Sequence, residues 1–257
     1  MISMEGLRLS LEQYPGLPEE AFCSTCRKPK GDHPAVIERL TARGENIQLA
    51  RAFMCQCAEV AKEDYVRRRM VAGIPVRHPP LSPYTFDTFR RRDLKAVGEA
   101  RRAAAMWANG EGKPILTFAG PVGVGKSHLA GAAAQYVLDH GGRVMYREEA
   151  RVFLLMRLAF NAETRGGADE IVSELCTIPW LVFDDLGLEK RSEWVDQTLS
   201  TIFLARSLGA GRLRTLVTTN AGPTEKEITK RVLDRLSEVS IAAGFEIDAP
   251  SYRIGGA

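Results

Sequence analysis

Residues 120–127 have the types and spacing of a phosphate-binding loop, Gly-Pro-Val-Gly-Val-Gly-Lys-Ser. Backbone N–H groups in such a loop turn inward around phosphate oxygens, and the positive end of the following helix points at the same anion. Lys126 would reach the β- and γ-phosphates, and the Ser127 hydroxyl would coordinate Mg²⁺. An apolar strand pattern precedes the loop and a helical pattern follows it. The segment therefore predicts a site for ATP and Mg²⁺, with these binding residues: Gly120, Gly123, Gly125, Lys126, Ser127 and His128.

A second apolar strand pattern, residues 181–183, ends in Asp184 and Asp185. Asp184 would hold Mg²⁺ through water, and Asp185 would orient or activate the attacking water. The alternative is a strand that merely ends in a solvated pair of carboxylates. The next strand ends at Asn220, whose amide would hold the γ-phosphate or the attacking water. Together these residues predict ATP hydrolysis.

Four of the five cysteines fall in two close pairs, Cys23/Cys26 and Cys55/Cys57. Four thiolates suit tetrahedral Zn²⁺, so the pairs predict one zinc site. Four unrelated reduced thiols are the alternative. His33 could replace one ligand, but a lone histidine beside Pro34 is more often simply exposed. The start of the chain lacks the pattern of a secretory signal, and the cytosol keeps thiols reduced, so a disulfide framework is not expected. The fifth cysteine, Cys176, lies in an apolar helical pattern and is expected in the core.

The segments around these motifs alternate between strand and helix patterns. Strands are expected at 115–119, 143–147, 180–183 and 214–219, and helices at 94–109, 126–140, 149–160, 168–177 and 193–208. This rhythm predicts an α/β fold with a parallel sheet covered by helices on both faces. The proline-rich stretch 73–83 cannot form a regular helix and marks a boundary. We therefore expect an N-terminal module at 1–72, a linker at 73–93 and an ATPase domain at 94–257.

The composition is ordinary for a globular protein, with a net charge of +3 at pH 7. A mildly basic chain permits nucleic-acid binding without requiring it. Basic triplets at 67–69 and 90–92 are either solvated helix ends or nucleic-acid contacts. No stretch approaches the roughly 20 apolar residues that a membrane-spanning helix needs. We expect a cytoplasmic protein with no membrane partner.

The order of the motifs resembles an AAA+ ATPase. More narrowly, the chain resembles the DnaC/DnaI-type replicative helicase loaders and the related IstB-like transposition ATPases, from about residue 73 to residue 253. The resemblance rests on Ala-Gly-Ile-Pro at 72–75 with Phe86 and Phe89, the phosphate loop, Asp-Asp-Leu-Gly at 184–187, Thr-Thr-Asn at 218–220, Arg-Val-Leu-Asp-Arg-Leu at 231–236 and Ser-Tyr-Arg at 251–253.

The resemblance implies an AAA+ P-loop sheet and roles for three arginines. Arg235 matches the arginine finger that reaches into a neighbouring subunit's ATP, and Arg231 is the alternative one helical turn earlier. Arg253 matches a terminal arginine near the subunit boundary. A solvated basic helix face is the competing interpretation of Arg231 and Arg235. Asp185 stands at a position where many AAA+ ATPases have Glu, whose side chain is one methylene longer. Hydrolysis is therefore expected, but its rate is not predicted.

The resemblance further implies a helicase loader that self-assembles on ATP, binds a replicative helicase through the zinc module and holds single-stranded DNA. The alternatives are an IstB-like regulator of a transposase on double-stranded DNA, a small-molecule kinase and a non-catalytic nucleotide switch. Arg151 and Arg157 are expected to contact single-stranded DNA, and Phe153 either stacks on a base or belongs to the core. The leucines Leu154, Leu155 and Leu158 are expected to form the core face of their helix.

Overall fold

The computed structural model describes residues 17–24, 28–42, 44, 55–77, 82–89, 95–161, 167–220 and 230–251. The predicted ligands Cys26 and Arg253, and the basic triplet 90–92, lie outside these residues. The chain divides between Arg68 and Arg69 into two compact units. Within the described ranges, no helix has both the length and the apolar character needed to cross a membrane.

The N-terminal unit packs short elements around a small apolar core. A 3₁₀-helix (Glu19–Ala21) leads into an antiparallel bridge between Phe22 and Pro29. The helix α1 (Pro34–Ala42) follows, and its proline stands in the first turn, where a missing N–H costs no hydrogen bond. Ala21, Phe22, Val36 and Leu40 are buried against one another. The sequence patterns do not predict α1. The helix α3 (Cys57–Ala72) begins in this unit, and its last four residues belong to the second unit.

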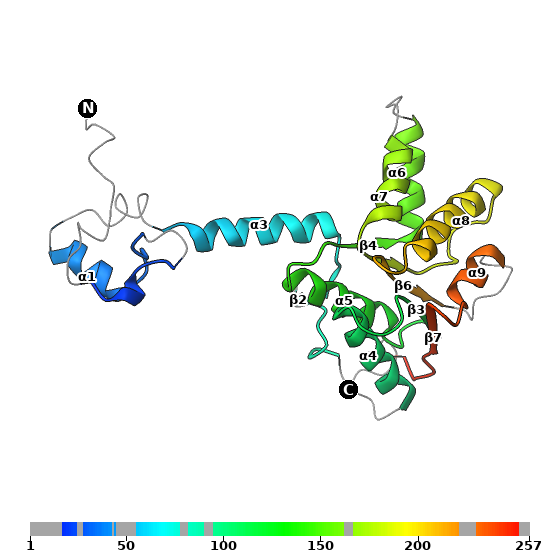
Figure 1. Ribbon diagram of the computed structural model, residues 1–257, viewed down its shortest axis with the longest axis horizontal. Helices are drawn as coiled ribbons and strands as arrows, with labels where there is room; N and C mark the ends of the chain where they lie inside the picture. The colour runs from blue at the N-terminus through cyan, green and yellow to red at the C-terminus, as the bar shows by residue number, and fades with distance from the viewer. Residues whose placement is uncertain are drawn as a thin grey trace. The chain divides into compact units, whose positions relative to one another are not determined.

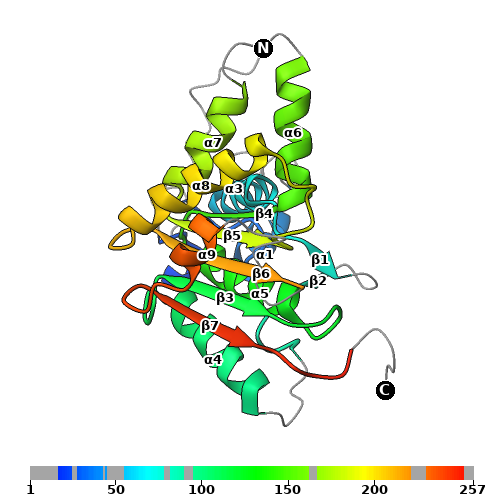
Figure 2. The same cartoon turned by 90° about the vertical axis from the view of Figure 1, so that its right-hand side faces the viewer.

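The second unit is built on a sheet of five parallel strands (Figure 2). Across the sheet the order is β4 (Val144–Glu148), β5 (Trp180–Asp184), β6 (Arg214–Thr219), β3 (Ile115–Ala119) and β7 (Ala242–Glu246). Four of these strands occur within a residue of the predicted ranges, and the predicted parallel sheet is confirmed. The strand β7 was not predicted, because its sequence Ala-Ala-Gly-Phe-Glu is poor in the β-branched residues that favour strands.

Helices cover both faces of this sheet (Figure 1). The helices α4 (Lys95–Ala108) and α5 (Lys126–Asp139) lie on one side. On the other side lie α6 (Glu149–Asn161), α7 (Gly167–Thr177), α8 (Glu193–Leu208) and α9 (Lys230–Leu236). Alternate strand residues such as Met145, Phe183 and Val217 face the larger core that these four helices share with the sheet.

A short antiparallel hairpin precedes the domain proper. It pairs β1 (Val76–Arg77) with β2 (Ser82–Pro83) inside the proline-rich stretch, which accordingly contains no helix among its described residues. Proline is tolerated at the edge of such a two-residue pairing because no further ladder bond is required of it.

The parallel register determines where the predicted site residues meet. Ala119 pairs with Thr219, and Phe183 pairs with Val217, so β3, β5 and β6 end at the same edge of the sheet. The strand β3 lies between β6 and β7, while the next strand along the chain, β4, lies at the far edge. Ligands of open parallel sheets bind beyond the carboxyl ends of the strands at such a reversal of strand order.

Candidate nucleotide site

The loop between β3 and α5 has the backbone geometry that its glycines predict. Gly120 has φ 145°, and a Cβ there would lie 2.3 Å from the carbonyl oxygen of Ile247. Gly125 has φ 106° and is the N-cap residue of α5, so its left-handed conformation turns the chain directly into the helix. Gly123 also has a positive φ. Glycine suits both the close approach at Gly120 and the positive φ of Gly123 and Gly125, and α5 presents its N-terminus at the loop.

Lys126 is the first residue of α5 and is only 4% exposed. Its Nζ donates to the carbonyl oxygens of Gly120 and Pro121 at 2.8 Å each, and to Oδ1 of Asn220 at 3.0 Å. An ammonium group held among oxygen acceptors, beside a helix N-terminus, has the surroundings that phosphate oxygens would replace. The residues present therefore fit the phosphates of a nucleotide. Ser127 follows in the first turn of α5 and is half-buried.

The ring of His128 lies against the segment that precedes α4. Its Nε2 is 3.1 Å from the carbonyl oxygen of Thr85 and 3.2 Å from Oγ1 of Thr88. Its ring packs against those of Tyr84 and Phe89, at centroid distances of 4.7 and 5.2 Å. Through these contacts His128 connects α5 to residues 84–89. A direct contact of this side chain with nucleotide stays a prediction.

Both carboxylate oxygens of Asp184, at the end of β5, accept hydrogen bonds from hydroxyl groups. Oδ2 accepts from Oη of Tyr146 at 2.5 Å, and Oδ1 accepts from Oγ1 of Thr218. Asp184 is 3% exposed, so these donors stand in for water around a buried charge. The pKa of Tyr146 is raised well above its ordinary value, first by burial and then by the negative charge of Asp184. Asp184 is thus held in one orientation by two neighbouring strands.

Asp185 adopts φ 56°, a left-handed conformation that is uncommon outside glycine. Its N–H donates to Oγ1 of Thr218 at 2.9 Å, and its Oδ1 accepts from Nδ2 of Asn220 at 3.4 Å. Burial raises the pKa of Asp185, the charge of Asp184 raises it further, and the charge of Lys126 lowers it. A carboxylate with a raised pKa is a suitable proton acceptor.

One set of contacts connects the predicted residues of three strand ends. Lys126 donates to Asn220, Asn220 donates to Asp185, and Asp185 is adjacent to Asp184. The chain therefore brings a cation, an amide and two carboxylates to one edge of the sheet. Such a set can bind phosphate, bind Mg²⁺ through a carboxylate and position a water molecule.

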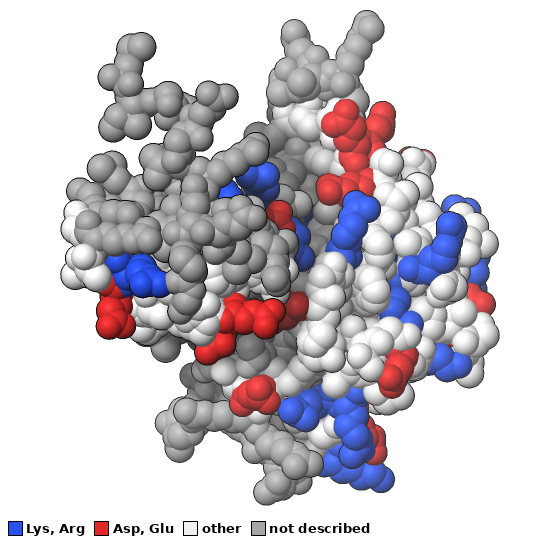
Figure 3. Space-filling view, turned by 60° about the vertical axis from the view of Figure 1, so that its left-hand side comes forward, with Lys and Arg blue, Asp and Glu red and all other residues white. Residues whose placement is uncertain are grey.

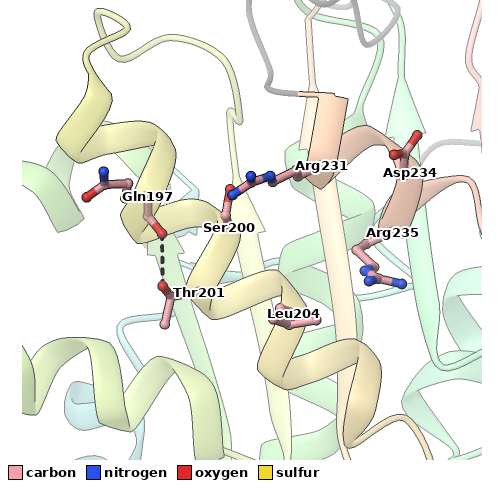
Figure 4. Close-up of a pocket in the computed structure, with 7 residues that line it drawn as sticks. All are labelled: Gln197, Ser200, Thr201, Leu204, Arg231, Asp234 and Arg235. Carbon is pink, nitrogen blue, oxygen red and sulfur yellow. Dashed lines mark hydrogen bonds between the residues drawn. The ribbon is translucent and has the colours of Figure 1, made fainter.

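Arg231 and Arg235 lie apart from this edge, in a pocket of about 600 Å³ between α8 and α9 (Figure 4). The pocket is lined by Gln197, Ser200, Thr201, Leu204, Arg231, Asp234 and Arg235. Arg231 extends from α9 towards Ser200, whereas Arg235 points away from α8 and pairs with Glu238 at 3.5 Å. None of the phosphate-loop residues lines the pocket. The pocket therefore does not connect either arginine to the phosphate loop of the same subunit.

Three of the four predicted zinc ligands lie together in the N-terminal unit. The sulfur atoms of Cys23, Cys55 and Cys57 are all within 4.8 Å of one another. Tetrahedral Zn²⁺ with Zn–S bonds of about 2.3 Å would separate its sulfurs by about 3.8 Å, so the cluster fits the ion. The N–H of Cys57 donates to Sγ of Cys55 at 3.4 Å, and Cys57 begins α3, whose N-terminus favours thiolates. Cys176, which was expected in the core, is half-buried and packs against the larger core of the second unit.

The face of α6 that is buried differs from the face that was predicted. Phe153 is fully buried and packs edge-on against Trp194, so it belongs to the core and does not stack on a base. Leu154, Leu155 and Leu158 are 52%, 40% and 54% exposed, so they do not form the core face. The expectation for these leucines was wrong, because apolar residues occupy most of the circumference of this helix and periodicity alone did not select the buried side.

Three residues of the site were not predicted from sequence: Tyr146, Glu149 and the hydroxyl of Thr218 as a link between the two aspartates. Tyr146 lies on β4, and Glu149 directly follows this strand. The strand β4 pairs with β5 in a register that places Glu148 opposite Asp184. A polar residue at the carboxyl end of a parallel strand is the signal that would identify such positions, and Glu148 and Glu149 carried it.

The chain is similar to proteins of DNA replication and of an insertion sequence. It is 26% identical over 137 residues to the replicative helicase loader DnaC of Buchnera aphidicola subsp. Acyrthosiphon pisum, which covers 53% of this chain and 55% of the relative. It is 27% identical over 208 residues to Rv3427c of Mycobacterium tuberculosis, named as an ATP-binding protein in an insertion sequence, which covers 76% of this chain and 79% of that one. The chain spans little more than half the length of the Buchnera loader.

Among solved structures, the crystal structure of the DnaC helicase loader superposes with a TM-score of 0.54 at 20% identity. The match covers 64% of this chain and 97% of that one. At this identity the likeness shows the fold, and it confirms the predicted AAA+ P-loop sheet. The sequence model of the family described as IstB-like ATP binding protein matches residues 58–254. Since that match spans most of the length and includes the phosphate loop, both strand-end motifs and α9, this chain belongs to the IstB-like ATP binding protein family.

Proposed function

We propose that the chain is an ATPase that uses Lys126 and Ser127 to bind the phosphates of ATP with Mg²⁺. Asp184 would hold the ion through water, and Asp185 with Asn220 would position the water that attacks the γ-phosphate. The observation that carries this proposal is the contact series from Lys126 through Asn220 to Asp185, at 3.0 and 3.4 Å. The bound ion would neutralise charge that develops on the phosphates.

We further propose that hydrolysis takes place between subunits of a self-assembled oligomer. Arg235, or Arg231 one turn earlier, would reach the ATP of a neighbouring subunit, and Arg253 would lie near that boundary. The support is the pocket between α8 and α9, where Arg231 projects into open space with hydroxyl groups beside it. A group from a neighbouring subunit would enter that space, and a triphosphate would match the guanidinium of Arg231.

The partners we propose are a DnaB-type replicative helicase and single-stranded DNA, in the cytoplasm. The similarity to helicase loaders supports the first, and the cysteine cluster adds a point of contact. The family match begins at residue 58, so Cys23, Cys55 and Cys57 precede it as an additional module, which zinc would hold together.

Nucleic-acid binding would rest on two arginines of α6. In the view of Figure 3, Lys and Arg side chains are interspersed with Asp, Glu and uncharged side chains. Arg151 is exposed on α6, and Arg157 is partly exposed and paired with Glu189. These two side chains would contact phosphates without reading the bases.

A second function is favoured by one observation. The Mycobacterium relative named for an insertion sequence aligns with 76% of this chain, more than the 53% of the Buchnera loader. An IstB-like ATPase that regulates a transposase on double-stranded DNA is therefore the alternative. Its sheet and nucleotide site would be the same, and the partner would differ.

Affinity capture separates the two functions. The tagged chain is incubated with lysate of its host, with and without ATP, and bound proteins are identified by mass spectrometry. Recovery of a replicative helicase in the presence of ATP supports the loader, whereas recovery of a transposase supports the alternative. Release of phosphate from ATP by the purified chain, lost in Lys126→Ala, tests the ATPase itself.

A further inference from the structure

A buried glutamate holds the loop that follows Asp185. Glu149 is the first residue of α6 and has no exposed surface. Its Oε2 accepts hydrogen bonds from the N–H groups of Gly187, at 2.8 Å, and of Glu189, at 3.0 Å. Glu149 touches no predicted nucleotide ligand in these bonds. Its carboxylate acts on the backbone two to four residues beyond Asp185.

The other side of the same loop is held by β6. The N–H of Asp185 donates to Oγ1 of Thr218, and the N–H of Leu186 donates to the carbonyl oxygen of Thr218 at 2.8 Å. Asp185 is the one non-glycine residue with positive φ in the described part of the chain. Such a conformation costs free energy and persists only where its surroundings hold it in place. Thr218 and Glu149 supply that support from opposite ends of the loop.

A second link joins α6 to the loop. Arg157, two turns after Glu149, forms an ion pair with Glu189. The arginine is 46% exposed, and exposed ion pairs contribute little, so the buried carboxylate is the stronger of the two links. Burial raises the pKa of Glu149, while the backbone bonds to the loop and the charge of Arg191 lower it. A carboxylate without solvent is costly, and the N–H groups of the loop are the groups that offset this cost.

We propose that Glu149 is a positioning residue for ATP hydrolysis, because its carboxylate holds the backbone of residues 187–189 and so directs Asp185 towards the nucleotide. The proposal rests on the ATPase proposed above and adds a residue on a different element. A simple structural role would instead lower stability and nucleotide affinity together.

The test compares Glu149→Ala and Glu149→Gln with wild type, with Glu170→Ala in the exposed first turn of α7 as the matched control. The alanine variant should keep its affinity for a fluorescent ATP analogue within about twofold, while kcat falls about tenfold or more, the scale of a misplaced catalytic group. The glutamine variant keeps one oxygen acceptor and should recover part of kcat. Glu170→Ala should match wild type in both.

Amide hydrogen exchange provides a readout that does not need turnover. Gly187 and Glu189 should lose protection in Glu149→Ala and retain most of it in Glu149→Gln, while α5 stays protected. Unchanged protection, or unchanged kcat in an alanine variant whose wild type hydrolyses ATP, overturns the positioning role. A parallel loss of affinity and kcat overturns it as well. Wild-type chain that binds ATP without hydrolysing it overturns the proposed ATPase instead, and the exchange result then still decides whether Glu149 holds the loop.

Discussion

The phenol of Tyr146 donates to Oδ2 of Asp184 at 2.5 Å, although 38 residues separate them in the chain. The two side chains meet because β4 and β5 are neighbours in parallel register, Tyr146 opposite Val182 and Glu148 opposite Asp184. Thr218 holds the other carboxylate oxygen from β6. The carboxylate that we expect to hold Mg²⁺ is therefore fixed by hydrogen bonds from both neighbouring strands.

Replacement of Tyr146 by phenylalanine should lower the free energy of unfolding by about 2 kcal/mol, the scale of a buried hydrogen bond to a charged group. The phenyl ring keeps the packing and removes only the donor to Asp184. Chemical denaturation measures the change. Tyr136→Phe is the control, because its hydroxyl makes a long exposed contact of 3.5 Å with Asn109. Equal stability of both variants would show that the Asp184 contact contributes nothing.

Lys126→Ala should weaken ATP binding by about 100-fold or more, since it removes the charge that meets the phosphates. Lys126 is buried, so the substitution also leaves the oxygens of Gly120, Pro121 and Asn220 without this donor. A modest loss of stability should accompany it. Titration with a fluorescent ATP analogue measures affinity, and Lys113→Ala, an exposed lysine, is the control. Wild-type affinity in Lys126→Ala would refute the assignment.

Asp185→Asn should keep ATP binding and slow hydrolysis by about 100-fold, the scale of a lost general base. The pH dependence of kcat provides a second test of the role of Asp185. Burial and the charge of Asp184 raise the pKa of Asp185, so its base form is lost as pH falls through a value above the ordinary aspartate range. The acidic limb of kcat should therefore lie above that range in wild type and disappear in Asp185→Asn. A limb that the variant retains belongs to another group.

Freshly purified chain, prepared without chelator, should contain about one zinc per molecule. Cys55→Ser together with Cys57→Ser should abolish the metal, because both sulfurs lie in the cluster with Cys23. Cys176→Ser should retain it, since that residue lies on α7 in the other unit. Elemental analysis measures the content. Zinc that survives loss of the Cys55/Cys57 pair would place the ion elsewhere.

Arg151→Ala with Arg157→Ala should weaken ATP-dependent binding of single-stranded DNA and lower its salt dependence by about 0.7 per lost phosphate contact. Of the two single variants, Arg151→Ala should weaken DNA binding more than Arg157→Ala, because Arg157 is paired with Glu189. Fluorescence anisotropy over a range of salt concentrations measures both. Arg143→Ala, exposed ahead of β4, is the control. Unchanged affinity and salt slope in the double variant would direct attention to the basic triplet at Arg67.

The phosphate loop and the aspartate pair were predictable because their chemistry depends on spacing along one strand–loop–helix segment. Gly120, Lys126 and Asp184 occupy the positions that this spacing assigns, and alternating strand and helix patterns were sufficient to predict a parallel sheet. The resemblance to the family rested on the same short motifs, and the family model, which matches residues 58–254, confirms it. Local backbone requirements leave a clear trace in sequence, since few residues other than glycine can satisfy them.

Contacts between distant segments were decided by tertiary structure alone. The strand β7 forms because β3 offers it a partner, despite a sequence that favours no strand. Phe153 is buried because Trp194 packs against it, whereas the leucines on the same helix face outwards. Tyr146 and Glu149 act on residues of another strand end and another loop, which only the pairing of β4 with β5 brings near. Burial and charge pairing depend on which surfaces meet, and no pattern within a single segment contains that information.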